Sequence, residues 1–309
     1  MIRPMDEKYL CEVFQIPVCA QKYLDKWFTC EEMEMLTHMG TNNFFPLQLA
    51  EIMHLEVEQA EKIIKTAYSR AVLNKDEENP LTYRASDFYS RLGVFCQFEN
   101  EKWHQIPEDD RVKIGNWYLD EFIRLNRPRW EKGERNDRVV PLHEALEALD
   151  AQDDPLYLCL CDCRSIFENC THSRETCISF YSGINSPADR GHAREISRDE
   201  AKELVKALDK EGLVHTLEGT SGMCNCCGDC CFEYRTSKKL NLIGTFPITH
   251  TIASWKEDTC IHCGKCARRC PMEAFVKKDK VVSFYPEKCI GCGICSTACP
   301  KQAIEIVER

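Results

Sequence analysis

The longest periodic run of apolar residues lies near the beginning of the chain. In residues 45–73, FPLQLAEIMHLEVEQAEKIIKTAYSRAVL, apolar side chains recur at the three- and four-residue spacing of a buried helix face. The pattern predicts two helices joined by a tight turn, with a shared core formed by Leu49, Ile52, Val57, Ala60, Ile63, Ile64 and Ala67. Before them, Thr29 and Glu32 form the two ends of a capping box, which predicts a further helix that stops at Gly40.

A hairpin is predicted immediately after these helices. Residues 72–88, VLNKDEENPLTYRASDF, predict two short strands around Asn79-Pro80, and the whole arrangement resembles a winged helix-turn-helix. Its second helix has three Glu near the N-terminal end, and residues 51–91 contain eight acidic and six basic side chains. Because DNA binding needs positive charge, this balance argues against DNA and favours a docking or homodimerisation role.

Further helices and short strands follow along the chain. Ser197 and Glu200 begin a helix that ends at Gly212, and residues 142–149 predict a short amphipathic helix. The predicted strands are short: PLYLCL at 155–160, two strands in AFVKKDKVVSFY at 274–285, and AIEIV at 303–307.

The cysteine content changes this picture. The chain has 309 residues, of which 22 are cysteine, and a formal net charge of −10. The first residues, MIRPMDEKYL, lack the apolar core of a signal peptide, and no apolar stretch reaches the length of about 18 residues that spans a membrane. We therefore expect a cytoplasmic protein without membrane insertion, whose thiolates hold metal. Since no GxGxxG or P-loop motif is present, we expect no nucleotide or flavin site.

A duplicated motif near the end of the chain predicts the kind of metal centre. Residues 260–271, CIHCGKCARRCP, and residues 289–300, CIGCGICSTACP, both follow the pattern C-x2-C-x2-C-x3-C-P. A tight turn with this spacing presents three thiolates to three corners of an iron–sulfur cubane, while the fourth cysteine points toward another cluster. Gly264, Gly291 and Gly293 let the backbone turn close to the inorganic core and are the candidate cofactor-binding glycines.

Residues 255–309 resemble the bacterial ferredoxins that hold two [4Fe-4S] clusters. The resemblance implies two clusters whose motifs exchange their fourth ligands. It assigns Cys260, Cys263, Cys266 and Cys299 to one cluster, and Cys289, Cys292, Cys295 and Cys270 to the other. A pair of zinc sites is the alternative, although zinc modules favour two separated C-x2-C pairs.

A second set of ten cysteines occupies the middle of the chain, in LCLCDCRSIFENCTHSRETC and CNCCGDCC. The candidate ligands among them, without individual assignment, are Cys161, Cys163, Cys170, Cys177, Cys224, Cys226, Cys227, Cys230 and Cys231. Cys224, Cys227 and Cys230 repeat the C-x2-C-x2-C spacing of the ferredoxin loops, and Cys159 is interpreted as a packed thiol. Because two cubanes need eight thiolates and neither segment supplies them alone, the two segments must fold together.

The order of these motifs is similar to that of poorly characterised iron–sulfur proteins of anaerobes, which also carry a winged-helix-like N-terminus. This resemblance implies redox work and one or two further iron–sulfur clusters; structural zinc is the alternative. The CCG at 226–228 also occurs in disulfide-reducing subunits with non-cubane clusters. Arg164 is a candidate hydrogen-bond donor to cluster sulfur or a surface residue. Nearby histidines are interpreted as ordinary polar residues: His172, His192, His215, His250 and His262.

The predicted fold class is α+β and multidomain. Its parts are a winged-helix-like, α-rich docking domain at 1–125, a linker with a short helix at 126–154, a cysteine-rich α/β cluster region at 155–249, and a two-cluster ferredoxin-like domain at 250–309. The motifs predict a protein that passes single electrons through [4Fe-4S] clusters to or from an oxidoreductase subunit or a low-potential redox protein. The alternatives are a redox-sensing winged-helix regulator and an enzyme with a catalytic central cluster.

Overall fold

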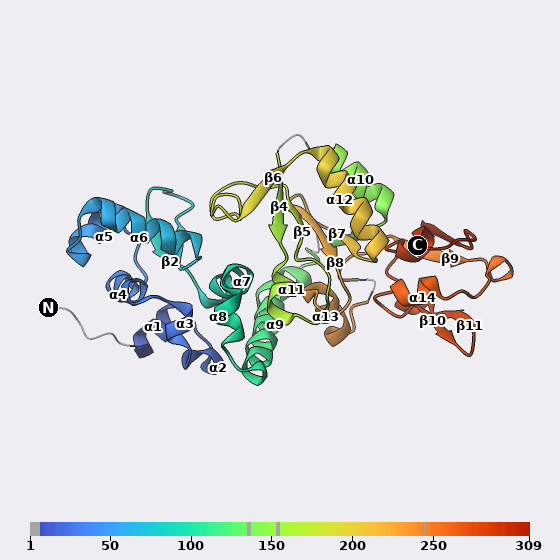
Figure 1. Ribbon diagram of the computed structural model, residues 1–309, viewed down its shortest axis with the longest axis horizontal. Coiled ribbons are helices and arrows are strands. Elements are labelled where there is room, and N and C mark those ends of the chain that lie inside the picture. The colour runs from blue at the N-terminus through green and yellow to red at the C-terminus, as the bar shows by residue number, and fades with distance from the viewer. Residues whose placement is uncertain (1–6, 135–136, 153–154, 244) are drawn as a thin grey trace. The chain divides into compact units, whose positions relative to one another are not determined.

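The structure is a computed structural model that describes residues 7–134, 137–152, 155–243 and 245–309. Helices and strands are mixed along the chain, as expected for the predicted class (Figure 1). The chain divides into two compact units. The first comprises residues up to Glu121 with Ser165–Phe167 and Ser182–Ala193, and the second comprises Phe122–Arg164, Glu168–Tyr181 and Arg194–Arg309.

The first unit is built mainly from helices. Its elements are α1 (Glu7–Val13), α2 (Val18–Gln21), α3 (Leu24–Trp27), α4 (Cys30–Met39), α5 (Pro46–Met53), α6 (Val57–Ser69), β1 (Leu73–Lys75), β2 (Tyr83–Ala85), α7 (Phe88–Phe98) and α8 (Asn100–His104). The expected helix–turn–helix is α5 and α6, and the expected hairpin is the antiparallel pair of β1 and β2. The capping box of Thr29 and Glu32 is formed at α4. Val57, predicted as a core residue, is 40% exposed because it begins α6 on the solvent side.

Residues Ser182–Ala193 belong to this first unit, although the predicted boundaries place them in the cysteine-rich region. The Asn185 side chain accepts a hydrogen bond from the Lys75 N–H and donates one to the Lys75 carbonyl, both at 2.9 Å. Asp189 accepts from Lys75 Nζ at 2.8 Å, and Arg190 donates to the Leu73 carbonyl at 3.0 Å. The edge of β1 that does not pair with β2 is therefore covered by a segment from much later in the sequence.

A buried ion network lies at the centre of the first unit. The fully buried Arg91 donates to the carbonyl oxygens of Trp27 and Arg70, at 3.1 and 3.0 Å, and to the Glu99 carboxylate. Arg70 reaches the same carboxylate at 2.9 Å. Burial alone would raise the pKa of Glu99, but the Arg91 and Arg70 charges hold it at about 2.

The second unit contains a six-stranded sheet in the order β3-β7-β8-β5-β4-β6. The strands are β3 (Asp137–Val140), β4 (Leu156–Leu160), β5 (Glu175–Ser179), β6 (Ala193–Ile196), β7 (Val214–Glu218) and β8 (Gly222–Cys226). The helices around it are α10 (Leu142–Asp150), α11 (Asp162–Phe167), α12 (Arg198–Glu211) and α13 (Phe232–Leu240). As predicted, the Ser197 hydroxyl caps the start of α12, and Gly212 ends it in a left-handed conformation.

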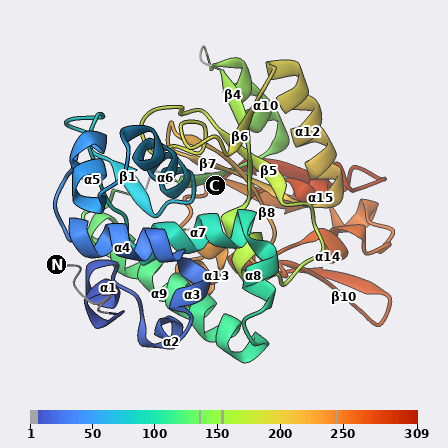
Figure 2. The same cartoon turned by 60° about the vertical axis from the view of Figure 1, so that its left-hand side comes forward.

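Helices α10 and α12 lie side by side against this sheet (Figure 2). Their apolar side chains pack with alternate residues of the strands in one buried core. Its members include Ala145, Leu149, Ala201 and Val205 from the helices and Leu156, Leu158, Ile178, Leu217 and Met223 from the strands. The sheet therefore has one apolar face that is covered by helices, and the residues next to these in sequence point to the other face.

The last part of the second unit is built from short elements. They are β9 (Thr251–Trp255), η1 (Glu257–Thr259), α14 (Lys265–Arg269), β10 (Phe275–Lys278), β11 (Val281–Phe284), η2 (Pro286–Lys288), α15 (Ile294–Thr297) and β12 (Ile304–Glu308). β10 and β11 form the hairpin predicted around the lysine-rich turn, and β12, also predicted, pairs antiparallel with β9.

The segment predicted as a linker has more structure than we expected. Helix α9 (Glu108–Glu131) runs through the expected boundary at residue 125, and β3 joins the edge of the sheet by pairing with β7. The charged residues around β3 concealed a strand whose last two residues, Val139 and Val140, are fully buried. The expected boundary at residue 154 lies outside the described residues. Over the part of the chain that is described, no helix combines the length and the apolar character needed to cross a membrane.

Replacing Glu99 with Gln should lower the free energy of unfolding by about 3 kcal/mol, because the buried Arg91 charge loses its partner. Lys102→Gln is the matched control: Lys102 Nζ contacts the same carboxylate at 2.9 Å but is 44% exposed, so its loss should cost less than about 1 kcal/mol. The folded pKa of Glu99 lies below its usual 4.5, so its contribution is complete above pH 4.5 and is lost as the pH falls toward 2. Urea unfolding at pH 7 and pH 4 measures the cost of each substitution and its dependence on pH. Equal costs for the two variants would contradict this account.

Candidate metal centres

A cavity lies between the first cysteine motif and β12. Its cysteines are Cys260, Cys263, Cys266 and Cys299. The first three come from the loop that leads into α14, and Cys299 comes from the second motif, after α15. The apolar side chains of Trp255, Val282 and Ile304 complete the lining. These four thiols are the set that the resemblance assigns to one cluster.

A second cavity repeats the arrangement. Its cysteines are Cys270, Cys289, Cys292 and Cys295, and its lining includes Ala253, Phe275 and Ile306. Cys270 belongs to the first motif, so each motif contributes three thiols to one cavity and one thiol to the other. A cubane needs four thiolates around a small apolar space, and both donor sets fit a [4Fe-4S] cluster.

Glycine and backbone N–H groups shape these cavities. Gly264 and Gly293 have φ of +78° and +79°, which turns the chain directly into α14 and α15. At Gly291 a Cβ atom would lie 2.2 Å from the Thr251 carbonyl oxygen, so only glycine fits there. The N–H groups of Ala274 and Ala303 point at Cys270 Sγ and Cys299 Sγ, at 3.2 and 3.3 Å.

Strand alternation places three of the central cysteines on one face of the sheet. In β8, Met223 packs on the helix face, so Cys224 and Cys226 point to the opposite face. In β5, Ile178 packs on the helix face, and Cys177 therefore points the same way as Cys224. The Sγ atoms of Cys177 and Cys224 are 3.9 Å apart.

Six thiols on this face form a closed ring of contacts, which we call the thiol ring. Its members in order of contact are Cys161, Cys163, Cys231, Cys226, Cys224 and Cys177, which returns to Cys161. Contact with Cys163 and Cys177 lowers the pKa of Cys161, whereas burial raises the pKa of Cys163. Opposite pKa shifts of this kind are expected where neighbouring thiols share protons, and a bound metal ion would remove the conflict by stabilising every thiolate.

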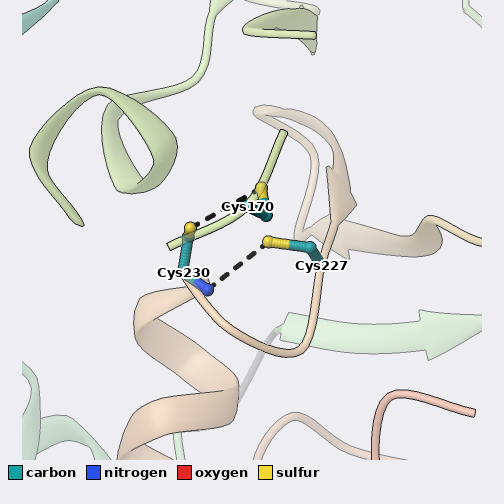
Figure 3. Close-up of side chains that lie close together, drawn as sticks. All are labelled: Cys170, Cys227 and Cys230. Carbon is teal, nitrogen blue, oxygen red and sulfur yellow. Dashed lines mark hydrogen bonds between the residues drawn. The ribbon is translucent and has the colours of Figure 1, made fainter. Parts of the chain in front are cut away.

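A separate group of three thiols, the thiol triad, consists of Cys170, Cys227 and Cys230. Their Sγ atoms all lie within 4.8 Å of one another, and those of Cys170 and Cys230 are 3.7 Å apart. Figure 3 shows the three side chains pointing toward a common centre, with Cys170 on the loop after α11 and the other two on the turn between β8 and α13. No other three His, Cys, Asp or Glu ligand atoms in the described ranges meet this closely.

The triad and the ring separate cysteines that the sequence presents together. Cys224, Cys227 and Cys230 share one C-x2-C-x2-C spacing in the sequence, but Cys224 belongs to the ring and the other two belong to the triad. The reason is that β8 ends at Cys226, so the chain turns before Cys227. The two cysteines of the CCG sequence likewise serve different groups. Cys159 is buried and donates to the Tyr157 carbonyl at 3.5 Å, as a packed thiol does.

Arg164 is a buried cation among these thiols. Its guanidinium donates to the Ser173 carbonyl at 2.8 Å, to Thr176 Oγ1 at 2.5 Å and to the Asn225 carbonyl. Burial lowers the pKa of Arg164, but the nearby thiolate charges, that of Cys161 first, outweigh it and raise the pKa. Arg164 is therefore a positioning residue within the core rather than a surface side chain.

Two polar residues next to Arg164, Asn225 and Thr176, were not predicted from the sequence. Asn225 donates to the Thr176 carbonyl at 2.6 Å and contacts His215 Nδ1 at the same distance. Thr176 is skipped by the ladder between β4 and β5, where Cys159 faces Cys177 and Leu160 faces Glu175. Thr176 precedes Cys177, and Asn225 lies between Cys224 and Cys226. The alternation of polar residues and cysteines along a strand is the signal that would have predicted them.

The histidines lie apart from the thiol centres or have other partners. His215 is held by Asn225, and His250 Nε2 lies 2.8 Å from Glu144. His192 belongs to the first unit, where it stacks on Phe98. His172 Nδ1 lies 3.6 Å from Glu211. His262 Nδ1 accepts from the Val282 N–H at 3.0 Å, and the backbone N–H of His262 points at Cys260 Sγ at 3.3 Å.

The thiol ring and the second cavity share one apolar core. Its buried members are Val139, Val214, Cys226, Cys231, Tyr234, Met272, Ile290, Cys292 and Ile294. Cys226 and Cys231 come from the ring, and Cys292 comes from the second cavity. At the same junction, a Cβ atom on Gly228 would lie 2.7 Å from the Pro271 carbonyl oxygen, so the two backbones are in direct contact.

Comparison with known proteins identifies one part of the chain. Residues 253–306 match the family model of a 4Fe-4S dicluster domain. No curated protein matches the chain. No solved structure matches it either. The C-terminal part is thus a 4Fe-4S dicluster domain, and the thiol ring and the thiol triad lie outside the matched residues.

Replacing Cys263 with Ala, or Cys292 with Ala, should each remove one cluster from the full chain, or about four iron atoms, because each change takes one thiolate from one cavity. Iron analysis of anaerobically reconstituted protein measures the loss. Cys30→Ala is the control, because Cys30 is exposed and lies far along the chain from both motifs. A variant that loses zinc instead of iron would contradict the assignment.

Proposed function

We propose that this protein carries single electrons through [4Fe-4S] clusters to or from an oxidoreductase partner. The observation that supports this most strongly is the exchange of Cys270 and Cys299 between two matched cavities. Exchanged fourth ligands hold two clusters at a short, fixed separation, which favours electron hopping over chemistry on a substrate. Bound there, the clusters supply one-electron redox chemistry.

The chain's own residues would set the potentials of these clusters. Backbone N–H groups that point at thiolates stabilise the more negative, reduced state, and burial in an apolar lining disfavours it. The donors from Ala274 and Ala303 occupy equivalent positions in the two motifs. The Gly291 N–H points at Cys289 Sγ at 3.4 Å, as the His262 N–H points at Cys260 Sγ at 3.3 Å, and Cys289 Sγ receives one further N–H group, from Ala253 at 3.5 Å. We therefore expect the Ala253 donor to favour the reduced state of the cluster in the second cavity, and the deeper burial of Cys289, Cys292 and Cys295 to oppose it.

The thiol ring is proposed to hold a further iron–sulfur cluster. Four of its six thiolates suffice for a cubane, and Arg164 offsets part of their negative charge. The apolar core that the ring shares with the second cavity supports a continuous route for electrons between the two centres. A partner would then exchange electrons with the ferredoxin-like domain while the central cluster stores or relays them.

The charge of the ferredoxin-like domain favours a stable partner. Residues 255–309 carry ten basic and seven acidic side chains. Two oxidised clusters with their thiolates add about four negative charges, so the loaded domain is close to neutral. Fast, steered encounters with many partners need strong complementary fields, whereas a near-neutral surface suits a lasting complex with an oxidoreductase subunit.

The reduced viologen radical, generated with dithionite, should transfer electrons to the isolated protein, one to each cluster, without turnover of any small molecule. Anaerobic stopped-flow absorbance follows the bleaching and its reversal. In native cells the protein should co-purify with an oxidoreductase subunit and stay bound as the salt concentration rises. A solitary protein that catalytically reduces a disulfide would contradict the carrier function and favour a catalytic central cluster.

The first unit should not bind DNA at physiological salt. Helix α6 exposes Glu58 and Glu61 together with Lys62 and Lys65, so it offers no net positive charge to phosphate. Asn185 also covers the free edge of β1, which leaves less of the hairpin available to contact DNA. A band-shift assay with the full chain, in oxidised and reduced states, tests this; a nanomolar, sequence-selective shift in either state would favour the redox-sensing regulator.

A further inference from the structure

The thiol triad has the spacing of ligands that share a single metal ion. Two thiolates on one tetrahedral zinc ion, with Zn–S bonds of about 2.3 Å, lie about 3.8 Å apart. Cys170 Sγ and Cys230 Sγ are 3.7 Å apart, and Cys227 Sγ completes a group within 4.8 Å. A cubane instead binds each thiolate through a different iron, so its ligands surround a cluster and three of them do not converge on one point.

The ferredoxin-like domain provides an internal comparison. Its eight cysteines surround two cavities, four to each, and no three of them approach one another as closely as the triad does. The same chain therefore presents two different ligand geometries. In the ferredoxin-like domain four thiols surround each cavity, which suits a cubane, whereas in the triad three thiols converge on one point.

The local backbone around Cys227 and Cys230 also favours a single ion. The sequence Cys-Gly-Asp-Cys forms a tight turn in which the Cys230 N–H points at Cys227 Sγ at 3.4 Å. Gly228 sits against the Pro271 backbone, which leaves no room for a side chain and fixes the turn. Asn169 Nδ2 donates to the Asp229 carbonyl at 3.3 Å, and this bond joins the loop of Cys170 to the same turn.

The fourth position of this site is not supplied by the described residues. No fourth ligand atom from His, Cys, Asp or Glu among them lies within the same distance of all three thiols. Structural zinc sites are closed by four protein ligands, whereas sites with three protein ligands keep a position for water or a substrate. Cys170 is partly exposed, so the site is accessible from solvent.

We propose that Cys170, Cys227 and Cys230 bind one Zn²⁺ ion, separate from the iron–sulfur clusters, with a fourth position open to an exchangeable ligand. The ligand class is water or a small thiol, because a thiolate-rich zinc ion favours soft donors. A Zn²⁺ ion with three thiolates carries one net negative charge, and the Arg164 guanidinium interacts electrostatically with Cys227 from the protein side. The inference does not depend on the clusters of the dicluster domain.

The full chain, purified anaerobically without added metal, should contain about one zinc per molecule in addition to iron. Zinc-edge X-ray absorption reports this ion alone, even with iron–sulfur clusters present. The expected first shell is three sulfur atoms at about 2.3 Å and one lighter atom at about 2.0–2.2 Å. Added 2-mercaptoethanol should replace the lighter atom with a fourth sulfur. A shell of four sulfur atoms before the thiol is added would overturn the open position.

Adjacent cysteines provide matched variants. Cys227→Ser should abolish zinc binding and leave the iron content unchanged, and Cys230→Ser should behave in the same way. Cys226→Ser changes the neighbouring thiol, which belongs to the ring, and should keep the zinc. Loss of iron rather than zinc in the Cys227 and Cys230 variants would overturn the proposal and assign the triad to an iron–sulfur cluster. Absence of zinc from the unchanged, folded chain would overturn it as well.

Discussion

The antiparallel pairing of β5 with β8 is the contact on which both central thiol groups depend. It places Ile178 opposite Met223, and both residues pack on the face covered by α10 and α12. Because side chains alternate along a strand, this register leaves Cys177 and Cys224 together on the other face. A shift by one residue would move the apolar residues out of the core and the thiols into it, so the apolar packing also enforces the ligand geometry. The end of β8 at Cys226 then decides which thiols stay in the ring and which turn away to the triad.

Bringing so many thiols together has an electrostatic cost that the fold does not offset alone. Burial raises the pKa of Cys163, and contact with its neighbours raises the pKa of Cys224, so a metal-free interior disfavours a full set of thiolates. Arg164 contributes one buried positive charge, and its own position depends on Thr176 and Asn225. The metal proposed for this region would supply further positive charge. Binding of the proposed metal would be coupled to the folding of the central region, because its ligands come from distant segments of the chain.

Local signals in the sequence predicted the elements that depend on local chemistry. The caps of α4 and α12, the hairpin of β10 and β11 and the helix pair α5–α6 follow from neighbouring residues, and all are present. The ferredoxin-like motifs were equally readable, because their spacing is itself the ligand geometry. The division of the central thiols into the ring and the triad could not be predicted, because it depends on where β8 ends and on the pairing of β8 with β5. The charged surroundings of β3 concealed a strand, and the packing of Ser182–Ala193 on β1 rests on side-chain hydrogen bonds that no local pattern encodes.

The shared core between the ring and the second cavity has a consequence for how the centres work together. Met272, Ile290 and Ile294 contact residues of the central sheet, so the dicluster domain does not stand apart as an independent module. Gly228 and Pro271 bring the triad turn against the backbone next to Cys270, which lines the second cavity. A change in charge at any one of these three centres is felt by the others across an apolar, low-dielectric interior, where Coulomb interactions are weakly screened. Reduction of the cluster in the second cavity should therefore make reduction of the cluster proposed for the ring more difficult.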